Sequence, residues 1–401
     1  MATKPKMVRA NAPTSNTDKV VQQLNAGWRN YICDAMKLNR DTFQLAQGTL
    51  GLQTTDSSGL FLIADAVPPS STIGYYDATS MNRRSSAFLD LLSALLPETN
   101  PNALQTALGD MYATWIAWKN ANPPQSGETV LDYFKRWEIQ SAVDPGRAAR
   151  AEQAIVAAQN TPLLKAYAAF TNPAGQQTFV DSAGKSYSLY AYAATISNAQ
   201  AAINQGGGLT LNFDSNKMDT SASSSFVDGS LSGFYLIFSA SAGASLAQEN
   251  AKAAGSGVVI TGTINKYATL SSGPGSWYTS SEVSRAYNAK GNAQIWDPNS
   301  SAGDWNSFFG QPNGSLSRFV SQLVLVSDYS ITVTSKATYS HSDFQQIRTN
   351  ASFGVWPFFS ASASSTQTTT YNLNSDSTLS VTQTLPKGSI QIWGVTVQSA
   401  P

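Results

Sequence analysis

Residues 187–213 read YSLYAYAATISNAQAAINQGGGLTLNF, and the change of pattern within this stretch decides the fold class. Its first part favours a helix over about 187–204, and the glycine triplet 206–208 ends that helix because glycine is a poor helix former. Residues 209–213 then alternate apolar and polar side chains, which is typical of a half-buried strand. The sequence therefore predicts an α+β protein, in which an N-terminal helical bundle is followed by a C-terminal, antiparallel, β-rich and sandwich-like domain.

Upstream of the triplet, apolar residues recur in steps of three and four, which predicts amphipathic helices. The longest pattern runs from about residue 14 to about residue 50, and roughly 30 residues in one helix would span about 45 Å. The positions that define it are Val21, Leu24, Trp28, Ile32, Ala35, Phe43, Ala46 and Leu50.

The helical domain is predicted over residues 14–206, after a flexible tail at residues 1–13. An irregular connector is expected at 53–82 and a helix at about 83–96. Prolines and capping residues mark further helix boundaries. These boundary signals are Asn100-Pro101, Ser126, Asp144-Pro145 and Pro162.

The β-rich domain is predicted over residues 207–401, where β-branched and aromatic residues alternate with polar ones. A short helix near 280–287 is expected to interrupt it. The predicted strands are 209–213, 234–241, 258–270, 319–339, 352–371, 379–385 and 390–397.

Charge is scarce in this chain and apolar residues are not. Charged side chains make up 12 % of the 401 residues, hydrophobic residues make up 42 %, and the formal net charge is zero. Such a chain can fold, and its surface repels copies of itself only weakly, which favours a homo-oligomer. Nucleic acid is not expected as a partner, because no cluster of Lys and Arg is present to bind phosphates.

The side chains on which enzymes and metal sites depend are also scarce. Cys33, which we expect to be buried and inert, and His341 are the only cysteine and histidine, too few for the usual zinc ligands. A Ser-His-Asp triad would have to use His341, and no G-x-S-x-G elbow or P-loop accompanies it. We therefore expect no enzyme activity, no metal and no cofactor. Asp297 and Asp304 stay open as a carboxylate pair for glycoside hydrolysis.

Two features indicate where function resides. The first is a set of aromatic residues in the loop-like stretch 277–309, whose rings suit stacking on sugars, apolar ligands or a membrane interface. The alternative is that these rings pin a long loop to the protein. The candidate binding residues are Trp277, Tyr278, Tyr287, Trp296, Trp305, Phe308 and Phe309.

The second feature is a pair of nearly charge-free β segments, 358–371 and 377–385, with one small or apolar face and one hydroxyl face. A membrane-spanning strand needs only about 9–11 residues of this kind. A hairpin of such strands can be stored in a folded protein and released on oligomerisation. Strands of an ordinary water-exposed sheet share the pattern, and unpacking of the long N-terminal helix is a rival route into a membrane.

A helical N-terminal part followed by a Ser/Thr-rich β part resembles, in architecture, several bacterial insecticidal and pore-forming toxins. We therefore expect a non-enzymatic protein that binds a membrane lipid or a cell-surface glycan or receptor and then oligomerises. We also expect it to be made in soluble form without a signal peptide and to act outside the cell, since no apolar run follows the basic residues near the N-terminus. The alternatives are a binding protein for an apolar small molecule or pigment, and a self-assembling storage or structural protein.

Overall fold

The chain combines helices with a seven-stranded antiparallel sheet, so the predicted α+β class is confirmed. The predicted order of helices before strands holds only in part, because among the described residues three strands precede residue 207 and three helices follow residue 275. The computed structural model describes residues 16–51, 56–69, 82–96, 102–125, 128–159, 161–221, 252–253, 255–293, 295–349 and 367–399.

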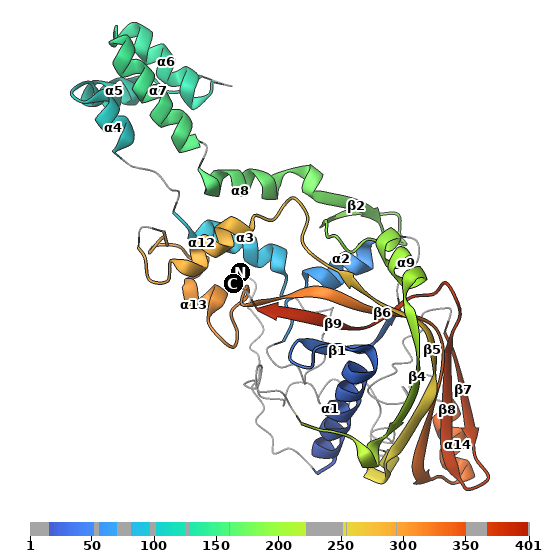
Figure 1. Ribbon diagram of the computed structural model, residues 1–401. Coiled ribbons are helices and arrows are strands. Elements are labelled where there is room, and N and C mark those ends of the chain that lie inside the picture. The colour runs from blue at the N-terminus through green and yellow to red at the C-terminus, as the bar shows by residue number, and fades with distance from the viewer. Residues whose placement is uncertain are drawn as a thin grey trace. The chain divides into compact units, whose positions relative to one another are not determined.

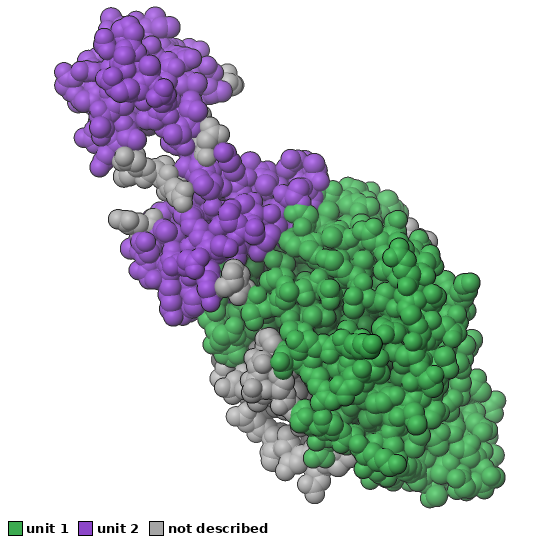
Figure 2. Space-filling model, in the orientation of Figure 1, with its two compact units in different colours: residues 1–85, 176–275, 309–400 green, residues 86–175, 276–308, 401 purple. Residues whose placement is uncertain are grey.

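The chain forms two compact units, each made of segments that are distant in sequence (Figure 2). We call the first the sheet unit and the second the helical unit. The sheet unit takes residues 1–85, 176–275 and 309–400, and the helical unit takes residues 86–175, 276–308 and 401.

β6 is the central strand of the sheet, and its 21 residues have different neighbours at its two ends (Figure 1). β5 pairs with it along one side, whereas on the other side β9 pairs with its first half and β8 with its second half. β1 continues the sheet beyond β9, β4 beyond β5, and β7 beyond β8. The strands are β1 (Phe43–Gly51), β4 (Gly207–Asp214), β5 (Val258–Ser271), β6 (Arg318–Thr338), β7 (Thr368–Leu373), β8 (Thr378–Leu385) and β9 (Gln391–Ser399).

Each face of the sheet carries its own apolar core, because successive residues of a strand point to opposite faces. Val324 and Val326 of β6 lie in a core shared with α1 and α14. Leu323 and Leu325 lie in the core on the other face, which is shared with α2 and α9. The helices of the sheet unit are α1 (Asn16–Met36), α2 (Ser58–Asp65), α9 (Ile196–Gln205) and α14 (His341–Thr349), with the 3-10 turn η2 (Ser215–Lys217).

The prediction of one helix from residue 14 to about residue 50 is wrong beyond Met36. Lys37 takes a left-handed conformation with φ of 56°, which ends α1. From Phe43 the chain forms β1 and pairs with β9, near the end of the chain. Apolar spacing within one segment could not reveal a partner so distant in sequence. The expected irregular connector at 53–82 likewise contains a helix, α2.

The predicted helix at 187–204 is wrong in its first half. Residues 186–190 form β3, which pairs with β2 in a separate two-stranded sheet, and α9 starts only at Ile196. The glycine triplet does separate α9 from β4, as predicted. The two strands are β2 (Gln176–Val180) and β3 (Ser186–Tyr190).

Two helices of the helical unit begin at predicted boundaries, since Pro145 and Pro162 open α7 and α8. The boundary predicted at Ser126 is wrong by a few residues, because α6 begins at Val130 and is capped by Thr129 through a capping box with Asp132. A long helix expected after Pro101 is divided at Gly109, whose φ is 56°. The helices that lie wholly or mostly in this unit are α3 (Arg84–Ala94), α4 (Ala103–Leu108), α5 (Met111–Ala121), α6 (Val130–Gln140), α7 (Pro145–Gln159), α8 (Pro162–Thr171), α12 (Ser280–Asn288) and α13 (Trp305–Phe309), with the 3-10 turn η1 (Pro173–Gly175).

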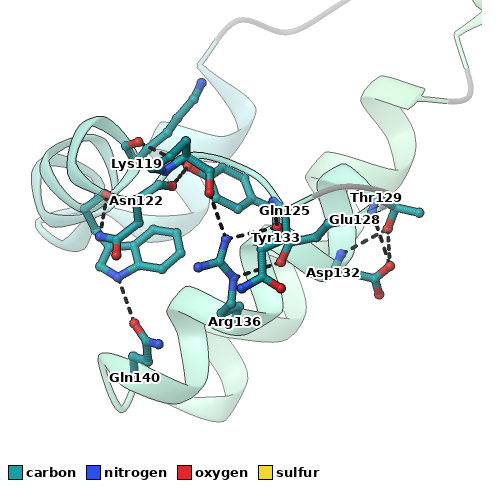
Figure 3. A network of polar contacts seen from close by, with 11 residues as sticks. Lys119, Asn122, Gln125, Glu128, Thr129, Asp132, Tyr133, Arg136 and Gln140 are labelled. Atoms are coloured by element: carbon teal, nitrogen blue, oxygen red, sulfur yellow. Dashed lines mark hydrogen bonds and ion pairs between the residues drawn. The ribbon is translucent and has the colours of Figure 1, made fainter.

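Aromatic packing and a polar network join α5 to α6 (Figure 3). The Tyr133 hydroxyl donates to the carbonyl of Lys119 at 3.1 Å, and the Trp118 indole donates to Gln140 at 2.9 Å. Arg136 forms an ion pair with Glu128 at 2.8 Å. The buried aromatic residues of α4 to α7 are Trp115, Tyr133, Phe134 and Trp137.

Three predictions from the sequence lie outside the described residues. They are the tail at 1–13, the strand at 234–241 and most of the strand at 352–371. Among the helices that the structure describes, none is both long and apolar enough to cross a membrane.

Candidate functional site

The aromatic residue Trp277 is a core side chain of the helical unit. Its side chain is fully buried, and its ring centroid lies 6.0 Å from that of Phe88 and 6.1 Å from that of Phe170. A Cβ atom on Gly175 would lie 2.9 Å from the Cβ of Trp277, so only glycine allows this close approach. Packing therefore accounts for Trp277.

Three further candidate residues are buried as well. Trp296 and Phe308 stack with their ring centroids 5.9 Å apart, and Trp296 forms an isolated β-bridge with Leu95. Their side chains are 8 % and 2 % exposed, and that of Phe309 is 3 % exposed. Rings buried to this degree are not available to stack on a ligand at the surface.

Tyr278, Tyr287 and Trp305 are the half-buried members of the set, and two of them come together. The rings of Tyr287 and Trp305 lie 5.7 Å apart, and the Trp305 indole donates to the carbonyl of Tyr287 at 2.8 Å. The ammonium of Lys290 lies 4.3 Å from the Trp305 ring centroid, in a cation–π contact. Surface binding by the aromatic stretch would therefore depend on Tyr278 and on the Tyr287–Trp305 pair.

The carboxylates of Asp297 and Asp304 both have local structural partners. Asp297 accepts a hydrogen bond from the backbone N–H of Asn299 at 2.9 Å, in a turn. Asp304 accepts hydrogen bonds from the hydroxyl and backbone N–H of Ser307, which lower its pKa and hold the start of α13. These contacts describe a turn and a helix cap.

His341 is the first residue of α14, whereas the sequence suggested the end of a strand. Its ring lies 3.3 Å from the side-chain amide of Gln345, one turn further along the helix. Asp343 accepts a hydrogen bond from the N–H of Ser340 and Ser340 accepts one from the N–H of Asp343, which caps the helix and lowers the pKa of Asp343. α14 was not predicted from the sequence, and the Ser340–Asp343 spacing is the signal that could have revealed it.

Cys33 is fully buried, as predicted, and its burial raises the pKa of the thiol to about 11. A thiol with so high a pKa stays protonated and unreactive at neutral pH. Within the described ranges, no group of three or more His, Cys, Asp and Glu side chains could hold a metal ion.

A regular array of polar side chains covers one face of β4, β5, β6, β8 and β7, and we call it the hydroxyl face. The strand register aligns it in three rows of five positions, none of them buried. Neighbouring hydroxyls in it hydrogen-bond across strands, Thr332 to Thr382 at 2.8 Å and Thr334 to Ser380 at 3.0 Å. The rows are Thr210, Thr263, Ser330, Thr384 and Thr368; Asn212, Thr261, Thr332, Thr382 and Thr370; and Asp214, Val259, Thr334, Ser380 and Asn372.

The opposite face of the same strands is apolar and lies beneath α1 and α14. It carries Ile260 on β5, Ile331 and Val333 on β6, and Leu379 and Val381 on β8, all buried. The prediction that residues 377–385 have one apolar face and one hydroxyl face is therefore confirmed for β8.

α1 covers the outer edge of β4. The hydroxyl of Tyr31 accepts a hydrogen bond from the backbone N–H of Asn212 at 2.6 Å, on the side of β4 that faces away from β5. α1 also holds the chain that follows β4, because Asn30 donates to the carbonyls of Asp219 and Ser221 at 2.9 and 2.8 Å. An ion pair with Arg40 at 2.6 Å lowers the pKa of Asp219 to about 2.

Short contacts also join the chain segments that enter β5 and leave β6. Lys252, shortly before β5, lies 3.8 Å from the carboxylate of Asp343 on α14. Its ammonium also lies 4.6 Å from the ring centroid of Tyr339, directly after β6. The two connections at this end of the sheet are thus held together by a charged contact and a cation–π contact.

The sequence predicted a hydroxyl face on residues 358–371 and 377–385 but not its extension across β4, β5 and β6. The signal that could have found it is the recurrence of hydroxyl residues at every second position, as in Thr261-Gly262-Thr263 and Thr368-Thr369-Thr370. The register between the strands could not be predicted, because the sequence of one strand does not show which residues of other strands pair with it.

With this geometry in place, comparison with known proteins adds no assignment: no protein-family model, no curated protein and no solved structure matches the chain.

Proposed function

We propose that the protein is a non-enzymatic, toxin-like protein of the insecticidal and pore-forming type. In this proposal it is made in soluble form, acts outside the cell, binds a membrane lipid or a cell-surface glycan or receptor, and oligomerises into a pore. The observation that carries the proposal is the five-stranded part of the sheet, which has a hydroxyl face, an apolar face and two edges.

The edges support oligomerisation. In the described part of the chain, β7 pairs with β8 alone, and Thr368 to Thr370 are exposed. β4 pairs with β5 and is covered on its other side by Tyr31. An uncovered strand edge pairs readily with another chain. β7 and β4 run in the same direction, so rotated copies can pair β7 of one with β4 of the next, head to tail.

The chain segments between the strands support membrane entry. The segment 222–251, between β4 and β5, contains only two charged residues, Asp228 and Glu249, and the segment 350–366, before β7, contains none. The first segment joins β4 to β5 beyond the pair Asp214 and Val259, whereas the second leads to the start of β7, where Thr368 pairs with Thr384 at the opposite end of the strands. Each segment exceeds the about 9–11 residues of a membrane strand.

The half-buried aromatic residues are the proposed contact with the target. Tyr278, Tyr287 and Trp305 combine an apolar ring with a polar atom, which suits a sugar or the headgroup region of a membrane. Lys290 beside Trp305 adds a positive charge for a phosphate or carboxylate on that target. The buried aromatic residues of the stretch have no direct part in this contact.

Release of dye from vesicles tests the proposal. Phosphatidylcholine vesicles with and without added glycolipid are loaded with a self-quenching dye and treated with micromolar protein. The proposal expects dye release together with oligomers on a mild-detergent gel. Intact vesicles of both kinds, with the protein still monomeric, would contradict it.

A division into a helical domain at 14–206 and a sandwich-like domain at 207–401 also stays a proposal. Limited proteolysis between Gln205 and Leu209 tests it: two fragments that each stay folded would support the division. We expect such fragments to remain associated, because β1 of the first pairs with β9 of the second. A storage protein and a pigment-binding protein stay as predicted alternatives. Light scattering near pH 6.6 would reveal a self-assembling storage protein. A native mass above that of the chain would reveal a bound small molecule.

A further inference from the structure

The hydroxyl face differs from a ligand-binding surface in composition. None of its fifteen positions is aromatic, and the only apolar side chain among them is Val259. Thirteen are Thr, Ser or Asn along aligned rows, and one more is Asp214, so fourteen of the fifteen side chains can form hydrogen bonds. Such a surface is suited to contact with water over its whole extent.

The face also carries no net charge. Asp214 is its only charged position, and Lys336 of β6 forms an ion pair with it at 2.8 Å. Lys336 lies two residues beyond Thr334, on the same side of β6, so the pair sits at the end of the array. The hydrogen bond from Lys336 lowers the pKa of Asp214, which keeps the carboxylate ionised and paired at neutral pH.

The positions of α1 and α14 determine which face of the sheet can point toward the axis of a ring of copies. α1 and α14 cover the apolar face of these strands, whereas the hydroxyl face remains exposed or half-exposed. If copies pair edge to edge and close, one face of the sheet must look toward the axis. Helices packed on the inward face would occupy the passage themselves, so the hydroxyl face takes that place.

From these three observations we infer that the hydroxyl face lines the water-filled passage of the oligomer and makes that passage nearly indifferent to the sign of an ion's charge. The inference rests on the proposed function. Ion selectivity in wide protein channels comes from rings of charged side chains, and lumen-facing substitutions change it. A wall of hydroxyls and amides without net charge therefore passes cations, anions and neutral solutes alike.

The test is the reversal potential of protein-treated planar bilayers under a potassium chloride gradient. The wild-type protein is expected to reverse near zero. Thr261→Glu should shift the reversal potential toward cation selectivity and Thr261→Lys toward anion selectivity, because Thr261 is exposed in the middle row. The shifts are expected to have opposite signs and to shrink in high salt.

The matched control is Thr178, an exposed threonine of β2 that lies outside the hydroxyl face. Its hydroxyl lies 3.2 Å from that of Ser188 on the neighbouring strand, as hydroxyls on the face do. Thr178→Glu and Thr178→Lys are expected to leave the reversal potential unchanged. Circular dichroism confirms that each variant is folded before it is used.

A cysteine variant keeps the inference testable if the charged variants do not assemble. Cys33 is buried, so a cysteine placed at Thr261 is the reactive thiol of the chain. A negatively charged thiol reagent should lower the conductance of Thr261→Cys and leave that of Thr178→Cys unchanged.

The outcomes separate the inference from the function on which it rests. Conductance that is strongly selective in the wild type, or unaffected by charge at Thr261, overturns the inference while the pore remains. A complete absence of conductance and dye release in the wild type overturns the proposed function itself.

Discussion

The aromatic stretch 277–309 is evident from the sequence, whereas the full extent of the hydroxyl face becomes evident only in the structure. The aromatic stretch is conspicuous in the sequence, yet Trp277, Trp296, Phe308 and Phe309 are buried. The hydroxyl face consists of ordinary residues, yet all fifteen of its positions reach the surface in aligned rows. Large apolar rings gain most free energy where water is excluded, so conspicuous aromatic residues first identify a core.

The largest expected difference between the two regions is in stability. Trp277→Ala should lower the free energy of unfolding by about 3–5 kcal/mol, because it leaves a cavity among Phe88, Phe170 and Tyr278. Thr261→Ala on the hydroxyl face should change it by only about 0.5 kcal/mol or less. Urea unfolding measures both, and a similar loss in the two variants would contradict the contrast.

The backbone beneath the hydroxyl face should be more sensitive than its side chains. Gly262 has φ of 154°, and a Cβ atom there would overlap the carbonyl oxygen of Ser330. Gly262→Val is expected to lower the free energy of unfolding by about 1–3 kcal/mol or more, since strain adds to the clash. Gly59→Ala is the control, because nothing lies within 4 Å of the added Cβ, and it should be neutral or slightly stabilising.

The covered edge of β4 should restrain assembly. Tyr31→Phe removes the acceptor of the Asn212 N–H and is expected to lower the free energy of unfolding by about 0.5–1.5 kcal/mol. With the edge loosened, oligomers should form faster on vesicles, as followed by light scattering. Tyr167→Phe is the control, since it loses a hydroxyl contact to Ser93 of 3.0 Å in the helical unit. Equal rates of oligomer formation in the two variants would show that α1 does not restrain pairing at the edge of β4.

The smallest expected effect is that of the ion pair at the end of the hydroxyl face. Asp214 has a pKa below its ordinary value of about 3.9, chiefly because Lys336 donates to it. A lowered pKa in the folded state gives stability that is present above the unfolded pKa and is lost as the pH falls through the folded pKa. Because both groups are partly exposed, Lys336→Met should cost only about 0.2–1 kcal/mol at pH 7.

That pH dependence is measured by urea unfolding of the wild type and Lys336→Met between pH 7 and pH 2. The difference between them should disappear below the pKa of Asp214. A difference that persists at pH 2 would assign the effect of Lys336 to packing of its alkyl chain and not to charge.

Much of the fold could be predicted from the sequence where the signal is local. The helices opened by Pro145 and Pro162, the short helix at 280–287 and strands β5, β6 and β8 follow from capping residues and alternation. The error at β1 had a non-local cause, because pairing with β9 overrode the helical spacing of Phe43.

The candidate surfaces were harder to predict than the fold. Neither the burial of Trp277 nor the alignment of Thr261 with Thr332 and Thr382 can be read from one segment, because each depends on neighbours from distant parts of the chain. Ser/Thr-rich strands were evident in the sequence, but only the register turns them into rows.

The most direct test of the account is whether β7 of one copy meets β4 of the next. Asn212 and Thr370 stand at opposite ends of one row, roughly 19 Å apart across four strand spacings, too far for a disulfide within one chain. A chain with Asn212→Cys, Thr370→Cys and Cys33→Ala is mixed with dye-loaded vesicles and oxidant. The account predicts dye release together with a ladder of reducible oligomers that is absent without vesicles. Dye release from vesicles while the protein stays a covalent monomer would contradict it.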